Sequence, residues 1–237
     1  MQVKSKFTSI IKTQPHLKCN IMGVRYQDSL EKIKMYLQLC CTDKITISPL
    51  FYRDYTCPSH CGGCCPKFSL VYFEGERWEK FKETYPQYAL TFDKRTLNNG
   101  VVIYEDIQKD NLQHHCKNLN MENGRCNIHE SNPFSCEFEL MKVRKVKDNI
   151  SIINKLFGRG WQLKRIDGER GAMCEMKGFS YDKFVRDLKL LKELNEYAKK
   201  LNYDTILPEV ISHFEEKDYL LKNNLVSNIP EVIYKKK

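Results

Sequence analysis

The chain has 237 residues, of which 41% are hydrophobic, and it carries a formal net charge of +9. Its length and apolar content are enough to bury a core, which excludes a chain that is disordered throughout. Apolar runs such as Val101–Tyr104 stop after four residues, far short of the roughly 18 that a membrane-spanning helix needs, so we expect a soluble protein without a membrane partner.

Two basic groups carry part of the positive charge, at Lys142–Lys147 and Lys235–Lys237. Such groups favour an acidic protein or nucleic acid as a partner. The alternation with Val143 and Val146 is equally typical of the solvent-facing side of an amphipathic strand. We expect a cytoplasmic location, with import into an organelle through the basic N-terminal arm as the alternative.

The first half of the chain alternates short helical and strand-like segments. Leu30, Ile33 and Leu37 recur at helical spacing after Ser29, which predicts a helix over 29–41. Amphipathic spacing predicts a second helix over 76–84. Alternating β-branched and aromatic residues predict strands over 45–52, 68–73, 87–92 and 100–105, the last two joined as a hairpin by the turn Asn98–Gly100.

The second half begins with strands at 138–147 and 161–166 around a short helix near 149–156 and then turns helical. Apolar residues repeat at three and four positions from Tyr181 to Leu201, and Pro208 and Pro230 bracket another helix. The pattern predicts the α+β class, with a small mixed cysteine-rich core of short strands and a helical C-terminal third. We expect three parts: an N-terminal arm and helix, a cysteine-cluster metal-binding domain, and a helical extension packing on it, over 1–44, 45–178 and 179–237.

Eleven cysteines need an explanation in a chain of this kind. A secreted disulfide framework would require an export signal and suits smaller folds. Ordinary buried cysteines would be scattered, whereas most of these are clustered. Metal ligation by thiolates accounts both for the clustering and for the lack of an apolar export signal.

The densest cluster runs from Cys57 to Cys65 and also holds Cys61 and Cys64. Gly62–Gly63 provides the sharp turn that thiolates close in sequence need in order to converge. The adjacent Cys64 and Cys65 project in different directions in most backbones, so both would not easily reach one ion. One of them could ligate a second metal, bridge two metals or complete an iron–sulfur cluster.

A second group of cysteines follows about fifty residues later, and one more lies beyond it. Four thiolates suit one zinc or one iron–sulfur cluster, whereas eight suit two zincs or a cluster with another ion. His60 and His129 are the leading imidazole candidates, ahead of His114 and His115. We interpret Cys19, Cys40 and Cys41 as buried apolar residues. The eight predicted metal ligands are Cys57, Cys61, Cys64, Cys65, Cys116, Cys126, Cys136 and Cys174.

The order of these motifs resembles the YkgJ-like family of cysteine-cluster proteins. The residues concerned are Cys57-x3-Cys61-x2-Cys64-Cys65, Cys116, Gly124-Arg125-Cys126-x-Ile128-His129 and Pro133-x2-Cys136-x-Phe138, within residues 55 to 140. The resemblance implies zinc or an iron–sulfur cluster as the cofactor, and an oxidoreductase without a defined reaction in some members. Two departures stand out: three residues instead of two separate Cys57 from Cys61, and Asn132 takes the place of an arginine.

Three functions are compatible with these patterns. The first is a metal-binding protein that holds an iron–sulfur cluster or zinc and is redox-active, as in an iron–sulfur oxidoreductase. The second is a structural zinc-binding adaptor without catalysis. The third is a protein related to lysine methyltransferases, because flagellin lysine N-methylases carry a similar cysteine cluster within a longer chain. The adjacent cysteine pair favours an iron–sulfur cluster over a single zinc.

Overall fold

The computed structural model describes residues 29–47, 53–56, 69–106, 116–120, 122–123, 125–138, 141–146, 149–154, 175–223, 225 and 232–235. Helices and short strands alternate along the first part, and two long helices follow near the C-terminal end, so the fold is α+β as predicted. The first part contains α2 (Ser29–Cys40), β1 (Lys44–Ile47), β2 (Arg53–Thr56), β3 (Leu70–Phe73), α3 (Glu76–Thr84), α4 (Pro86–Ala89), β4 (Asp93–Thr96) and β5 (Val102–Asp106). The second part contains η2 (His129–Ser131), α5 (Phe134–Glu137), β6 (Met141–Val146), β7 (Asn149–Asn154), β8 (Glu175–Phe179), α6 (Tyr181–Lys200), α7 (Leu207–Lys222) and β9 (Val232–Lys235).

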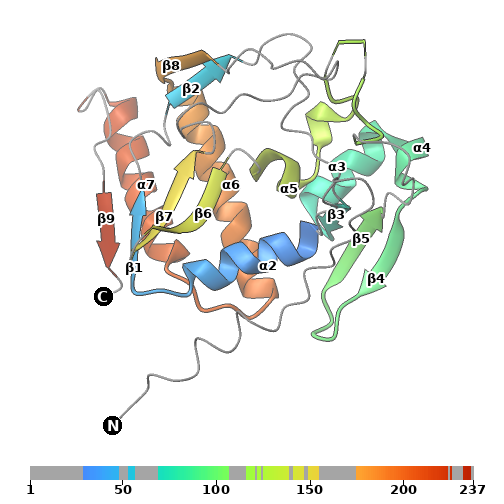
Figure 1. Ribbon diagram of the computed structural model, residues 1–237, viewed down its shortest axis with the longest axis horizontal. Coiled ribbons are helices and arrows are strands. Elements are labelled where there is room, and N and C mark those ends of the chain that lie inside the picture. Colours follow the sequence, from blue (N-terminus) through green and yellow to red (C-terminus); the bar gives the residue numbers. More distant parts are fainter. Residues whose placement is uncertain are drawn as a thin grey trace.

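The described strands form three small sheets. The first has the order β6-β7-β1-β9, in which β1 pairs parallel with β7 and antiparallel with β9. The second is the antiparallel sheet β3-β5-β4, and the third is the antiparallel pair β2-β8. The first two sheets lie on opposite sides of the view in Figure 1, with α2 running between them.

The long helix α6 shows why this sequence forms helices near its C-terminal end. The hydroxyl of Ser180 accepts a hydrogen bond from the Lys183 backbone N–H and caps the helix, while Lys199 and Lys200 favour the negative end of its dipole. The helix ends where Asn202 takes the left-handed conformation, with a φ of 58°. No helix within the described ranges is both long and apolar enough to cross a membrane.

A main core gathers one face of each of α2, α6 and α7 with residues of β1, β3 and α5. Each fully buried leucine or phenylalanine there stabilises the fold by about 1.5–3 kcal/mol relative to an exposed one. We call this set the main core, and it includes Ile33, Leu37, Ile45, Val71, Phe73, Phe134, Phe138, Phe184, Leu191, Leu194, Tyr197, Val210 and Phe214.

The strand β3 separates the main core from a second cluster, because all four of its residues are buried. Successive side chains of a strand point to opposite faces. Val71 and Phe73 therefore enter the main core, whereas Leu70 and Tyr72 enter the second cluster. We call the second set the aromatic cluster; it comprises Leu70, Tyr72, Trp78, Phe81 and Ile128.

Two predicted segments were wrong. Residues 87–92 do not form a strand: Pro86 begins the short helix α4, and the first strand of the hairpin starts at Asp93. Proline is favoured at the first position of a helix because its fixed φ suits that position. Residues 149–154 form the strand β7 rather than a helix, since Ile150 and Ile152 alternate within a strand that pairs on both sides.

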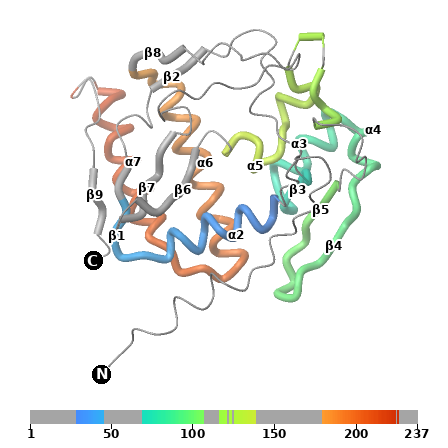
Figure 2. The backbone as a smooth tube through the Cα atoms, in the orientation of Figure 1, coloured from blue at the N-terminus to red at the C-terminus, as the bar shows by residue number. Residues whose placement is uncertain are grey.

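The other predictions fall into two groups. The helices over 29–41, 76–84 and 181–201, the helix between the two prolines and the strands β3 and β6 are confirmed within a few residues. β9 lies beside β1 and adds a strand to the C-terminal third (Figure 1). The tube in Figure 2 shows α7 and the β4–β5 hairpin on opposite sides of α2. The predicted strand at 161–166 lies outside the described residues.

Candidate metal centre

Three of the eight predicted ligands lie in the described part of the chain: Cys116, Cys126 and Cys136. All three are half-buried. The other five lie outside the described residues; they are Cys57, Cys61, Cys64, Cys65 and Cys174.

The direction of Cys136 is set by the two phenylalanines on either side of it. Phe134 and Phe138 are four residues apart, so they share one face of α5, and both are buried in the main core. Their rings stack with a centroid separation of 5.0 Å, and Phe138 also contacts Tyr36 at 5.3 Å. Cys136 lies half-way between them in sequence and packs instead against the aromatic cluster.

Cys126 is held by a small antiparallel loop. Leu119 and Cys126 form an isolated β-bridge, the Asn120 N–H donates to the Arg125 carbonyl at 2.8 Å, and the Asn127 N–H donates to the Asn118 carbonyl at 2.7 Å. The Asn120 side chain accepts from two backbone N–H groups of the turn, as asparagine commonly does. This local network orders Cys126 without a long helix or strand.

Cys126 and Cys136 are brought to the same place, because both pack against the aromatic cluster. The phenol of Tyr72 lies near both of them. Burial raises the pKa of this phenol well above its usual value. Thiolates at Cys136 and Cys126 would raise the pKa further, against the Arg77 guanidinium, which lowers it. Tyr72 therefore stays protonated and donates to the Ser131 carbonyl at 2.7 Å, which fixes the turn before Cys136.

The remaining candidates in the described part do not join this pair. No three His, Cys, Asp or Glu side chains among the described residues come together as a metal-binding group. Cys116 begins the turn in which its carbonyl accepts from the Leu119 N–H at 3.0 Å. His129 is exposed at the start of η2.

The pairing of β2 with β8 bears on two ligands outside the described residues. In this antiparallel ladder Thr56 is the partner of Glu175. Thr56 immediately precedes Cys57 in the sequence, and Glu175 immediately follows Cys174. Two segments 119 residues apart in sequence are therefore joined at the positions bonded to these two cysteines.

The three cysteines outside the predicted ligand set were expected to be buried, and the structure confirms this only for Cys40. Cys40 is fully buried in the main core, as predicted for a small apolar residue, and burial raises the pKa of its thiol. Cys41 was also expected to be buried, but it is exposed, and its thiol donates to the Leu37 carbonyl at 3.4 Å. It follows the last residue of α2, where the chain leaves the core. Cys19 lies outside the described residues.

Comparison with known families gives a match over the part of the chain that holds most of the cysteines. A family model named CxxCxxCC, with the description "Putative zinc- or iron-chelating domain", matches residues 56–155. The match contains every predicted ligand except Cys174, and the YkgJ-like resemblance agrees with it. No curated protein and no solved structure gives a significant match to the chain.

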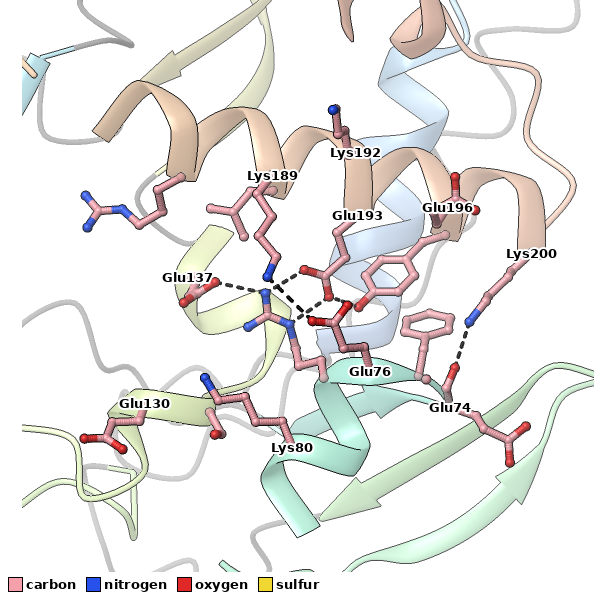
Figure 3. A pocket seen from close by; sticks show the side chains of 17 residues that line it. Glu74, Glu76, Lys80, Glu130, Glu137, Lys189, Lys192, Glu193, Glu196 and Lys200 are labelled. Atoms are coloured by element: carbon pink, nitrogen blue, oxygen red, sulfur yellow. Dashed lines mark hydrogen bonds and ion pairs between the residues drawn. The ribbon is translucent and has the colours of Figure 1, made fainter. Parts of the chain in front are cut away.

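The segment that matches the CxxCxxCC family model, residues 56–155, is joined to α6 by an ion-pair network that the sequence did not reveal. Arg77 of α3 donates through Nε and Nη2 to the two carboxylate oxygens of Glu193, at 2.7 and 2.6 Å. It also donates to the Asn132 carbonyl at 2.8 Å and to the Glu137 carboxylate at 3.0 Å. Tyr197 donates its hydroxyl proton to Glu193 (Figure 3). Glu137 is thus an ion-pair partner of Arg77.

Burial and charge act in opposite directions on Arg77. Burial disfavours the charged guanidinium and by itself would lower its pKa, but the hydrogen bonds and charges of Glu193 and Glu137 outweigh that effect and raise the pKa above its usual value. The side chain keeps 18% of its surface exposed. It faces a groove of about 470 Å³ between α3, η2 and α6, whose rim also carries Lys80, Lys189 and Glu76.

Proposed function

We propose that this chain is a metal-binding protein whose CxxCxxCC domain holds an iron–sulfur cluster through thiolates. The proposed ligands are Cys57, Cys61, Cys64, Cys65, Cys116, Cys126, Cys136 and Cys174. The observation that carries the proposal is the convergence of Cys126 and Cys136, ten residues apart, on one buried aromatic cluster. Each is turned there by its own neighbours, a bridged loop in one case and a pair of phenylalanine anchors in the other.

The ladder between β2 and β8 supports a contribution from Cys57 and Cys174 to one centre. The Cα atoms of bonded residues are 3.8 Å apart, and the strand partners Thr56 and Glu175 are bonded to these two cysteines. Partner Cα atoms in an antiparallel pair are about 4.5–5.5 Å apart. The residues to which these two cysteines are bonded therefore lie side by side at the same end of the ladder, which is what ligands of one site require.

The donor set fits both zinc and iron–sulfur clusters, because thiolates are good ligands for each. The adjacent Cys64 and Cys65 favour a cluster, whose separate iron atoms offer separate attachment points. Such a cluster would supply one-electron transfer. The chain's own residues would supply the ligands, and Tyr72 and the main-core anchors of α5 would hold Cys126 and Cys136 in place.

A structural zinc site is the second candidate, and one observation favours it. The segments that carry Cys116, Cys126 and Cys136 contain only a three-residue 3₁₀ helix, a four-residue helix and a single bridge within residues 116–138 that the structure describes. Elements this short are marginal by themselves. A metal that contributes folding free energy directly would stabilise them.

Metal analysis of protein purified without oxygen tests the proposal. We expect iron with acid-labile sulfide and a broad visible absorption band, whereas stoichiometric zinc in a colourless protein would favour the second candidate. Cys126→Ser and Cys136→Ser should each lower metal content. Cys41→Ser is the matched control, because Cys41 is exposed and outside the ligand set. Protein with neither metal would contradict the proposal.

A further inference from the structure

One guanidinium holds both ends of the short segment that carries Cys136. The Nη1 group of Arg77 donates to the Asn132 carbonyl at 2.8 Å, and Nη2 donates to the Glu137 carboxylate at 3.0 Å. Asn132 precedes Pro133 and the helix α5, and Glu137 is its last residue. Cys136 therefore lies inside a stretch of six residues whose first and last members contact the same side chain.

Arg77 is itself fixed by α6, which lies outside the CxxCxxCC match. Glu193 binds the guanidinium with both carboxylate oxygens, a two-point geometry that sets the plane of the group. Tyr197 donates to the same carboxylate, and its ring stacks on Phe73 with a centroid separation of 4.1 Å. A continuous set of contacts therefore runs from the main core through Glu193 and Arg77 to the segment of Cys136.

The segment has few other means of keeping its position. The helix α5 has four residues and no side-chain cap, which is too short to be stable alone. Phe134 and Phe138 determine which face of α5 turns to the main core, but a face does not fix the position of the helix along its axis. Hydrogen bonds at both ends do fix that position. Replacing Arg77 would remove this hydrogen bond to the Asn132 carbonyl. Because Asn132 is buried, leaving its carbonyl without this bond costs free energy.

We propose that Arg77 is a positioning residue for the metal ligand Cys136, and that Glu193 of α6 sets the position of Arg77. The proposal rests on metal binding by Cys136, as proposed above. The C-terminal helices then contribute to the metal centre without providing a ligand. Residues that hold metal ligands from outside the coordination shell typically change metal affinity by 10- to 100-fold when replaced.

The test is how firmly full-length variants hold the metal. For zinc this is the affinity from competition with a chelator of known affinity, and for an iron–sulfur cluster it is the rate of iron release to a chelator. Arg77→Met should bind the metal found in the wild-type protein about 10-fold more weakly or worse. Arg77→Lys keeps the charge but lacks the planar fork, so a smaller loss is expected. Glu193→Gln should weaken binding in the same direction, although Glu193 touches no cysteine-bearing segment directly.

Two controls separate positioning from a general loss of stability. Arg95→Met removes an arginine that pairs with Glu105 at 3.0 Å in the same domain, on the hairpin β4–β5. Phe214→Leu loosens the packing of α7 on α6 in the main core, far along the sequence from the cysteines. Both variants should keep wild-type metal affinity within about twofold. This should hold even if metal-free Phe214→Leu protein loses as much thermal stability as metal-free Arg77→Met protein.

The outcomes distinguish this inference from the proposed function. Wild-type protein that binds no metal overturns both. Wild-type protein that binds metal, with Arg77→Met and Arg77→Lys within about twofold of its affinity, overturns the positioning role alone. A Phe214→Leu protein that loses as much affinity as Arg77→Met also overturns it, because the effect would then follow stability in general.

Discussion

The Arg77–Glu193 bridge connects two regions that are ordered in different ways. On one side, α6 and α7 are long amphipathic helices whose apolar faces fill the main core. On the other, residues 116–138 contain mostly turns. Their described hydrogen bonds come from asparagine side chains, from single backbone pairs and from the side chains of Tyr72 and Arg77. Periodic burial stabilises the first region. The second depends on the aromatic cluster and, in our proposal, on metal.

Removal of the metal should have the largest effect and should fall on the second region. Chelation is expected to lower the free energy of unfolding by at least about 4 kcal/mol where free metal had exceeded Kd by 1,000-fold. Amide exchange followed by mass spectrometry should show lost protection in 116–138 and retained protection in α6 and α7. Equal loss in both regions would contradict the contrast drawn here.

A cavity in the main core should give the reverse pattern. Phe214 is fully buried between α7 and α6, and Phe214→Ala is expected to cost about 3–5 kcal/mol in chemical denaturation. Because no proposed ligand lies on these helices, the metal content of the folded protein should not change. Phe214→Leu is the graded control and should cost less. A loss of metal in proportion to stability would show that the two regions are not separable.

The aromatic cluster predicts a smaller effect at the boundary between the regions. Tyr72→Phe removes the hydroxyl that donates to the Ser131 carbonyl and leaves that carbonyl without this partner. We expect a cost of about 1–2 kcal/mol in the free energy of unfolding, with the ring contacts kept. Tyr88→Phe, at an exposed position, is the control and should cost almost nothing. Similar losses of unfolding free energy in the two variants would contradict the stabilising role of the Tyr72 hydroxyl.

The smallest effect concerns pH and belongs to the helical region. Burial lowers the pKa of His213 on α7, and Lys217 lowers it further, against an opposing effect of Glu216. The unfolded chain therefore takes up a proton at higher pH than the folded one. The contribution of neutral His213 to the free energy of unfolding is complete above the unfolded pKa of about 6.5, and it is lost as the pH falls toward the folded pKa. His213→Gln should flatten this slope in denaturation measured between pH 7.5 and 5, and an unchanged slope would refute the prediction.

Sequence reasoning worked where the signal was local. The helices α3 and α6 followed from apolar periodicity. The Asn-Asn-Gly turn correctly marked a hairpin, although its first strand is β4 and not the predicted segment 87–92. It failed where the structure of a segment depends on the strands that pair with it. β7 is an example, because it forms a strand by pairing with β1 and β6. Arg77 gave no signal, because it reads as an ordinary surface residue of α3 and its partner Glu193 is 116 residues away.

The candidate site shows the same division. The cysteine motifs pointed to the residues that the family match contains, and the chemistry of thiolates pointed to a metal. What the motifs did not supply was the scaffold: the opposed faces of α5 and the loop bridged at Leu119 and Cys126. These features depend on contacts between residues distant in sequence, and the spacing of cysteines within a motif does not predict such contacts.

The two-sided burial of β3 limits how this protein tolerates changes in chain length. An insertion of one residue before Tyr72 would exchange the two faces of the strand, sending Tyr72 toward Tyr197 and Phe73 toward the cysteine pair. Both clusters would lose their fit at once. The exposed turn at Asn99–Gly100 is subject to no such rule, since its ends are held by the ladder between β4 and β5. Length variation among related chains should therefore collect at that turn and avoid the four residues of β3.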